Sequence, residues 1–156
     1  MVNITNAGTL SGSDGTGHIC VNVYAFDPAE EMISCCTCTV SPNGLQSISV
    51  RGSLTSNPLT PAIPTSIIIK LLATTSSGGC DAASPTAGNL APGMRAWGTT
   101  LHALPTSPVT YGVTETEFSP AVLSASELDT LTSFCGFIQE TGSGHGICSG
   151  CSTGGL

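Results

Sequence analysis

Apolar and polar residues alternate along several short stretches of the chain, which is the pattern of β-strands with one face toward a core. The clearest stretch is residues 18–26, in which Ile19, Val21 and Val23 share one face and Cys20 and Asn22 share the other. Similar patterns predict further strands over residues 2–7, 32–40, 45–54, 67–72, 95–103 and 109–118.

Short turn signals join three of these strands. Asp27-Pro28 ends the first, and Ser41-Pro42-Asn43-Gly44 places Pro at the second turn position and Asn-Gly where positive φ is needed. We therefore expect residues 18–26, 32–40 and 45–54 to form an antiparallel meander. Residues 67–72 are apolar on both faces, which predicts an interior strand, buried on both sides or at an interface.

One helix is predicted over about residues 125–140. Ser124 lies three residues before Glu127, which makes a capping box, and Leu123 and Leu128 form a hydrophobic staple. Apolar residues then recur at helical spacing: Leu128, Leu131, Cys135 and Ile138. This spacing predicts that the Cys135 side chain faces inward. The fold class is mostly β: an antiparallel β-sandwich of about seven to eight strands, disulfide-braced, with one late α-helix.

The chain holds eight cysteines, an even number that favours disulfides and an oxidising compartment. Alternation along residues 33–40 places Cys36 and Cys38 on one face and Cys35 on the other, so this strand is expected to be the hub of the framework. Cys35 and Cys36 should not bond to each other because neighbours in a strand point apart. The other pairings stay open. The disulfide candidates are Cys20, Cys35, Cys36, Cys38, Cys80, Cys135, Cys148 and Cys151.

The composition is polar without being ionic: 40% of residues are apolar and 8% are charged, against about 25% charged in ordinary domains. The net charge is −7, and the cations are Arg51, Lys70 and Arg95. Three scattered cations cannot build a basic patch, which argues against nucleic acid or an anionic membrane as a partner. No apolar run reaches the ~20 residues that span a bilayer. No signal-peptide pattern follows Met1, so secretion would imply a mature chain.

Two segments are expected along the chain. Residues 1–14 form a leading strand and a flexible joint, because Ser, Gly and Asp dominate residues 11–17. Residues 15–156 form a single sandwich domain with a Cys/Gly-rich tail. Freed by the joint, Val2 and Ile4 are the candidate donor-strand residues that would complete the sheet of a neighbouring copy.

The cysteines also allow a metal site. Cys35 and Cys38 form one C-x-x-C pair and Cys148 and Cys151 form another, and together these four could hold zinc or iron. The spacing between the pairs is much longer than in compact zinc ribbons, so disulfides are favoured. His18 and His145 both follow Gly-rich turns near a cysteine, but such turns are common in a Gly-rich chain. His102 is expected to be a partly buried structural histidine.

The signals for catalysis are weak, and the chain is not expected to be an enzyme. No Gly-x-Ser-x-Gly elbow is present, and no catalytic residue or cofactor is predicted. Glu115 and Glu117 lie two apart, like the carboxylates of a glycosidase, but also like a solvated strand face. A carbohydrate-binding or hydrolytic domain would need Trp97, Tyr24 or Tyr111 in a cleft near carboxylates. Asn3-Ile4-Thr5 is a glycosylation sequon.

Several runs of the sequence resemble a known family. They are Ile19-Cys20 with Tyr24-Ala25-Phe26-Asp27, Cys35-Cys36-Thr37-Cys38, Asn43-Gly44-Leu45, residues 54–59, Arg95-Ala96-Trp97-Gly98-Thr99, residues 115–118 and residues 123–135. Together they are similar to exported cysteine-rich bacterial proteins, best represented in acidobacteria. The resemblance implies export, and therefore oxidised cysteines. It implies no activity and no catalytic residues.

These observations predict a secreted structural protein, found outside the cell or at its surface. It would be a subunit of an extracellular filament or surface assembly, with copies of itself as partners and β-strand addition as the contact. Polar strand faces built from Ser, Thr and Asn motivate this, because they lack the charges that usually protect strand edges. The alternative is an extracellular metal-binding or redox protein that uses the paired C-x-x-C cysteines.

Overall fold

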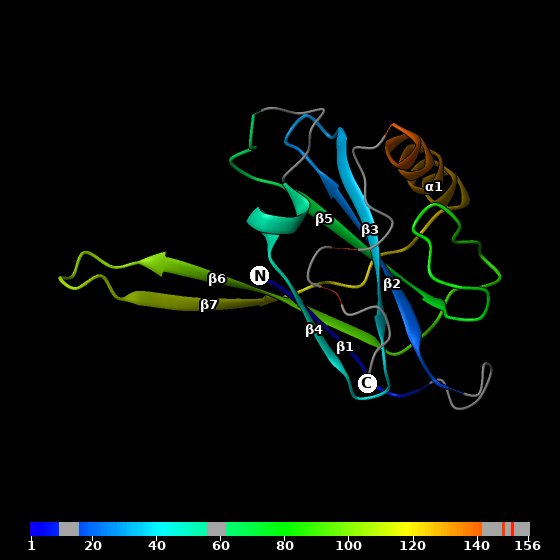
Figure 1. The fold of residues 1–156 in the computed structure, drawn as a ribbon, viewed down its shortest axis with the longest axis horizontal. Helices are drawn as coiled ribbons and strands as arrows, with labels where there is room; N and C mark the ends of the chain where they lie inside the picture. Colours follow the sequence, from blue (N-terminus) through cyan, green and yellow to red (C-terminus); the bar gives the residue numbers. More distant parts are fainter. Residues whose placement is uncertain (10–15, 56–61, 142–147, 149–150, 152–156) are drawn as a thin grey trace.

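The computed structural model describes residues 1–9, 16–55, 62–141, 148 and 151. Within them the chain forms two antiparallel sheets, ordered β4-β1-β6-β7 and β3-β2-β5, and one late helix (Figure 1). This confirms the predicted mostly-β sandwich. The elements are β1 (Val2–Asn6), β2 (Ile19–Phe26), β3 (Met32–Val40), β4 (Leu45–Ile48), β5 (Ile68–Thr75), β6 (Met94–Ala103), β7 (Tyr111–Glu117) and α1 (Ala125–Glu140).

The main core lies between the two sheets and follows the alternation of the sequence. Ile19, Val21 and Val23 of β2 are fully buried there, facing Val2 and Ile4 of β1 across the sandwich. A polar group is buried among them, because the Asn6 amide donates to the carbonyls of Gly17 and Val40. These two bonds satisfy the amide donors and hold the end of β1 against the other sheet.

A second, smaller core lies on the other face of the three-stranded sheet, under α1. Tyr24, Cys35 and Leu131 pack together in it. The helix begins as predicted, since the Ser124 hydroxyl accepts a hydrogen bond from the Glu127 amide. Leu128, Leu131, Cys135 and Ile138 are its buried residues, which confirms the predicted inner face. The molecule therefore has three layers: sheet, sheet and helix.

The predicted meander is wrong at its third strand. β2 and β3 pair as expected, but β4 pairs with β1 in the opposite sheet. The chain also leaves extended structure after Ile48: Val50–Leu54 forms a short π-helical turn. The Ser49 hydroxyl accepts a hydrogen bond from the Gly52 amide at its start, a local side-chain bond that competes with strand pairing.

The interior strand predicted for residues 67–72 is in fact an edge strand. β5 pairs with β2 on one side, and on its other side the described chain adds only an isolated bridge, Thr74 to Leu90, with backbone bonds to Asn89 and Ala91. Ile69 and Leu71 pack toward the main core, but Ile68 and Lys70 are exposed. Apolar residues on both faces thus reflect two different neighbours: the main core on one face and, at Leu72, the small core under α1 on the other.

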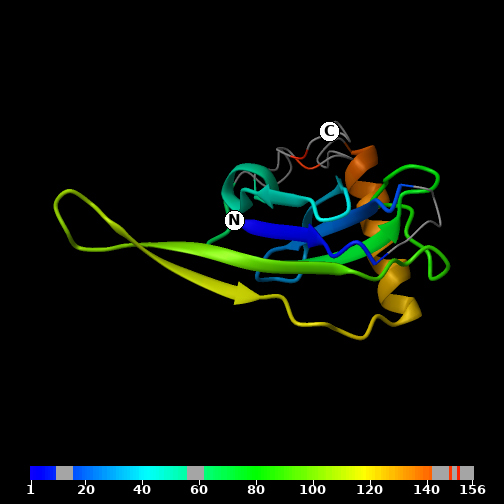
Figure 2. The same ribbon diagram turned by 90° about the horizontal axis from the view of Figure 1, so that it is seen from below.

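β6 and β7 extend beyond the sandwich as a projecting hairpin (Figures 1 and 2). β6 pairs with β1 through Gly98 and with β7 from Trp97 to Ala103. Its outer half therefore has a partner on one side. We call residues 99–114 the arm, and the rest of the sandwich with α1 the body.

Candidate functional site

Four disulfides join all eight cysteines, at Cα–Cα distances from 4.8 to 5.6 Å. These distances suit a disulfide. β3 is the hub that the sequence predicted: Cys35 bonds to Cys135 of α1, while Cys36 and Cys38 bond to Cys148 and Cys151. The fourth bridge joins Cys20 of β2 to Cys80. Cys35 and Cys36 do not bond to each other, as expected.

The alternative metal set does not converge. Cys35 lies in the small core under α1, whereas Cys38 and Cys148 lie in the main core on the other face of the sheet. The sulfurs of Cys38, Cys148 and Cys151 do lie within 4.8 Å of one another, but they belong to two disulfides. A metal would need these thiols reduced, because the thiolate is the ligand.

Among the described residues, neither His18 nor His102 belongs to a group of potential metal ligands with the cysteines. His18 is half-buried at the start of β2, and His145 lies outside the described residues. The prediction for His102 is wrong: it is exposed on the arm, where its Nε2 lies 2.8 Å from the Thr114 hydroxyl. The sequence reading failed here because a strand pattern does not reveal that the strand leaves the body.

The candidate donor residues Val2 and Ile4 lie inside their own sandwich. β1 runs between β4 and β6, paired with both, and the two side chains are almost fully buried. Residues 2–6 are thus part of the same structural unit as the rest of the chain. The joint that was to free them falls mainly on residues 10–15, outside the described residues. Their use by another copy stays a prediction.

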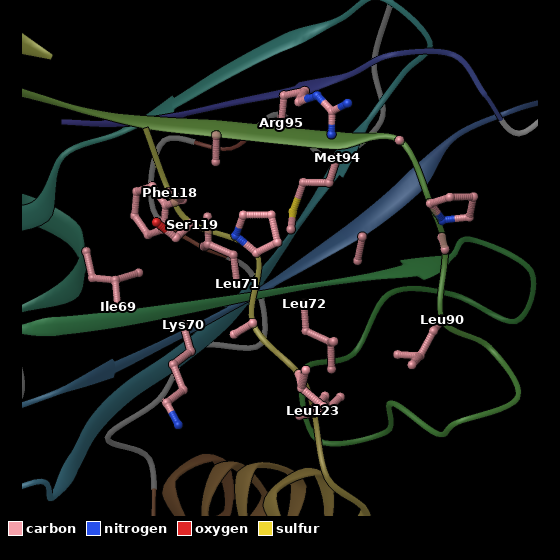
Figure 3. Close-up of a pocket in the computed structure, with 18 of the residues that line it drawn as sticks. Ile69, Lys70, Leu71, Leu72, Leu90, Met94, Arg95, Phe118, Ser119 and Leu123 are labelled. Atoms are coloured by element: carbon pink, nitrogen blue, oxygen red, sulfur yellow. The ribbon is translucent and has the colours of Figure 1, made fainter. Parts of the chain in front are cut away.

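A groove opens beside the outer edge of β5, which Leu90 and Ala91 border at one end, and has a volume of about 570 Å³ (Figure 3). Ile69 and Leu71 line it from β5, and Met94 from β6. The connection from β7 to α1, residues 118–124, crosses this opening with Phe118 half-buried and Val122 exposed. The groove therefore has an apolar lining, and the chain's own segment 118–124 crosses it.

Equal numbers of cationic and anionic side chains line the groove. Lys70 and Arg95 line it together with Glu117 and Glu127. The Lys70 ammonium pairs with the Glu127 carboxylate and lies 5.7 Å from the centre of the Phe26 ring. This joins β5 to the first turn of α1 at the surface. Exposed ion pairs contribute little stability, so the contact mainly positions the two elements.

The arm has one apolar and one polar face. Cross-strand pairs place Leu101 opposite Val113 and Ala103 opposite Tyr111, so all four share a face. On the other face, Thr100 is opposite Thr114. The apolar side chains are open to solvent: Leu101 is 61% exposed, Val113 60% and Tyr111 58%. A two-stranded ribbon that exposes its apolar face to water is unusual, because it leaves an apolar surface unburied.

The outer edge of the arm is also open. β7 is the last strand of its sheet, and within the part of the chain that the structure describes no strand pairs with its outer edge. Residues 96–114 contain no Asp, Glu, Lys or Arg. Charged side chains and prolines are the usual protection of an exposed edge. Here the strands lack charges, and Pro105 and Pro108 lie in the loop between them.

Of the aromatic residues proposed for a carbohydrate cleft, Trp97 lies in a hollow near carboxylates and Tyr24 does not. Trp97 lies beside Arg95, Glu115 and Glu117 in a shallow hollow of about 400 Å³ on the outer face of the sheet. Tyr24 is buried far from it in the small core, where its hydroxyl donates to the Ala82 carbonyl at 2.8 Å. Burial raises the pKa of this hydroxyl, and the charge of Asp81 raises it further. That the chain is not an enzyme stays a prediction.

Asp81 belongs to the loop that follows the Cys20–Cys80 bridge. Burial alone would raise the pKa of this carboxyl, but hydrogen bonds from the Ser84 hydroxyl, the Ala83 amide and the Gln139 side chain hold it below its usual value. The bond from Gln139 ties the loop to α1. Asp81 is therefore a structural group, and its carboxylate is committed to these three donors.

The sequon residue Asn3 lies on the outer face of the four-stranded sheet. Its amide donates to the Thr99 hydroxyl, and its carbonyl oxygen accepts from the Ser47 hydroxyl. These bonds join β1 to both of its neighbours. A sugar on the Asn3 nitrogen would have to replace the bond to Thr99.

The groove and the arm were both missed by the sequence reading. The groove is made by segments far apart in the chain, so no local pattern marks it. The arm had a signal, since residues 96–114 form a long uncharged stretch that holds two predicted strands. Alternation in that stretch predicts ordinary sandwich strands, because the pattern indicates that one face is buried but not which part of the protein covers it.

Comparison with protein-family models, with curated proteins and with solved structures finds no match for the chain. The resemblance to exported cysteine-rich bacterial proteins therefore stays a prediction. No helix within the described segments has the length and apolar character that crossing a membrane requires. What can be stated of the chain is its architecture: a disulfide-rich antiparallel β-sandwich with one late helix.

Proposed function

We propose that the protein is a secreted structural subunit whose copies join by β-strand addition into an extracellular filament or surface assembly. The observation that carries this proposal is the projecting arm. It exposes the apolar side chains of Leu101, Tyr111 and Val113 and the unpaired outer edge of β7. An isolated two-stranded ribbon is at best marginally stable in water, so a further strand or surface is the expected partner.

The extracellular location is supported by the cysteines. Four disulfides hold the body together, and two of them bridge more than 110 residues: Cys36–Cys148 and Cys38–Cys151. Such bonds persist in oxidising surroundings and are rare in the cytosol. A subunit that must survive outside the cell also gains from bridges that restrict its unfolded state.

Strand addition is supported by the chemistry of the open edge. An extended segment that joins a free sheet edge gains backbone hydrogen bonds, and alternate side chains set its specificity. Residues 111–114 of β7 carry no charge, so this part of its edge presents no like charge to an incoming strand. A contact between two different surfaces propagates unless the rotation closes a ring, which suits a filament.

Exchange of β1 is a second route to the same assembly. Val2 and Ile4 of one copy would fill the place between β4 and β6 of another, with the contacts that they now make within one chain. A chain that lacks residues 1–9 should then fold when a peptide of residues 1–9 is added. If the peptide leaves that chain unfolded, β1 cannot act as an exchanged donor.

The test of the proposed function is self-association of the purified, oxidised protein. Light scattering with size-exclusion chromatography and negative-stain imaging should show growth with protein concentration, without one fixed number of subunits. A particle that remains a monomer at every concentration would contradict the proposal. The same sample titrated for thiols under denaturing conditions should contain no free thiol.

The metal alternative has one specific observation in its favour. After reduction, the thiols of Cys38, Cys148 and Cys151 would lie close enough to share one ion, because their sulfurs are within 4.8 Å. Cobalt added to reduced protein should then give a thiolate charge-transfer band that Cys38→Ser removes. Without that band, or with the same band in the variant, this alternative is excluded.

A further inference from the structure

We infer that the apolar face of the arm of one copy docks into the groove beside β5 of a second copy, so that subunits join head to tail. This inference rests on the proposed assembly and names its two contact surfaces. The occupant of the groove is thus a defined segment of the same protein, residues 99–114, which we call the arm.

The arm offers apolar side chains that its own body cannot bury. Leu101 and Val113 form a cross-strand pair, and Tyr111 lies on the same face toward the tip. Each is more than half exposed. Burying such a side chain contributes about 1.5–3 kcal/mol, so three of them make an effective anchor for a partner.

The groove offers a matching apolar surface. Ile69, Leu71, Met94 and Phe118 line it, and the exposed side chains of Leu90 and Val122 lie at its rim. Figure 3 shows Ile69, Leu71, Met94 and Phe118 together in the space between β5 and β6. Small-ligand pockets bury most of their ligand. Val122 is 94% exposed, which suits an extended protein segment better than an enclosed small molecule.

Charge favours this pair of surfaces over others on the molecule. Each copy has a net charge of −7, so two copies repel each other in most orientations. The arm carries no formal charge. The groove has two cations and two carboxylates, which cancel: Lys70, Arg95, Glu117 and Glu127. A neutral arm in a neutral groove is therefore a contact that meets little of this repulsion.

The geometry of β6 requires that the partner be another copy. Met94, at one end of β6, lines the groove, and Leu101 lies seven residues further along the same strand. At ~3.3 Å per residue, the two sites are roughly 23 Å apart along a rigid strand. The arm projects away from the body (Figures 1 and 2). It cannot fold back into its own groove, so docking links one molecule to the next.

Two charge-pair variants test the contact. The arm variant is Leu101→Glu with Val113→Lys, which leaves the net charge unchanged and places opposite charges across the two strands. Its matched control is Thr100→Glu with Thr114→Lys on the polar face of the same arm, also a cross-strand pair. The groove variant is Leu90→Glu with Val122→Lys. Its control is Phe134→Glu with Phe137→Lys, exposed apolar residues of α1.

Since all substituted side chains are exposed apolar residues or arm threonines, each variant should fold with intact disulfides and a near-native melting temperature. We expect the arm and groove variants to weaken self-association by more than about a hundredfold. Both controls should assemble like the native protein. If either the arm or the groove variant assembles normally, the inference is overturned.

Mixing the two variants gives the decisive result. The groove variant keeps an intact arm, and the arm variant keeps an intact groove. The mixture should therefore form a heterodimer that does not grow further. Neither variant alone should form it. If the mixture stays monomeric, the arm does not bind the groove.

The same series separates this inference from the proposed function. A native protein that assembles, with variants that also assemble, contradicts the arm-and-groove contact and leaves the structural function intact. A native protein that never assembles contradicts both. A small apolar molecule that binds the native protein and the arm variant equally, in a native protein that does not self-associate, would assign the groove to a ligand and overturn the inference.

Discussion

The body and the arm of this protein are built from the same kinds of strand but reach opposite outcomes. In the body, alternate side chains are buried between two sheets, and four disulfides tie α1, the loop at Cys80 and the cysteines at 148 and 151 to the three-stranded sheet. In the arm, the apolar side chains of β6 lie on the face opposite to buried Ala96, and there Leu101 and Val113 meet solvent. The difference shows that alternation marks an apolar face without saying what covers it, and under the proposed assembly the cover of the arm is another copy.

The largest difference between the two regions should come from the disulfides. Replacing Cys35 and Cys135 together by Ala removes a bridge across 100 residues and should cost about 2–5 kcal/mol of unfolding free energy. The arm contains no cysteine, so the exposure of its tip should not change. Denaturant unfolding measures the first effect, and limited proteolysis near residues 104–110 measures the second. A body of unchanged stability would show that the bridges do not brace it.

A matched pair of truncations compares burial directly. Ile4→Ala removes a fully buried side chain from the main core and should cost about 2–5 kcal/mol. Leu101→Ala removes an exposed side chain and should change the stability of dilute monomers by no more than about 0.5 kcal/mol. Thermal unfolding at low concentration gives both values. Equal costs would mean that the arm is packed within its own chain.

The small core under α1 can be tested through one hydrogen bond. Tyr24→Phe removes the hydroxyl that donates to the Ala82 carbonyl and should cost about 1–2 kcal/mol, because the buried carbonyl loses its partner. Tyr111→Phe, on the arm, is the control and should cost almost nothing. Chemical denaturation of both variants provides the comparison, and a neutral Tyr24→Phe would show that the carbonyl finds another donor.

The smallest effect concerns pH and Asp81. Its pKa is lower in the folded chain, so its carboxylate stabilises the fold above the unfolded pKa, and this contribution is lost as pH falls through the folded value. Asp81→Asn should therefore destabilise at neutral pH by less than about 1 kcal/mol, since the group is largely exposed, and should match the native protein in acid. Asp129→Asn, on the exposed face of α1, is the control. If the unfolding free energies of Asp81→Asn and the native protein differed by the same amount at every pH, the charge of Asp81 would have no role in stability.

The sequence predicted most of the body for identifiable physical reasons. Strand alternation located β2 and β3, and the Ser124 cap with inward Cys135 located α1. It also predicted that Cys35 and Cys36 would bond to different layers. These features depend on near neighbours in the chain, and local periodicity reports them well.

What the sequence could not predict depends on distant partners. β4 left the expected meander because β1 offered it a free edge, and a hairpin signal cannot weigh that competition. β5 became an edge strand although its apolar residues suggest an interior one. His102 was expected to be partly buried, and it is exposed because β6 continues past the last residue that pairs with β1.

The central claim is that a second copy covers the arm, and hydrogen exchange at its backbone amides tests it most directly. In dilute monomers, the amides of Leu101 and Val113 should exchange quickly while those of β2 and β3 stay protected. In assembled protein, the arm amides should become protected as well. Arm amides that are already protected in the monomer, or that remain unprotected in the assembly, would contradict the account.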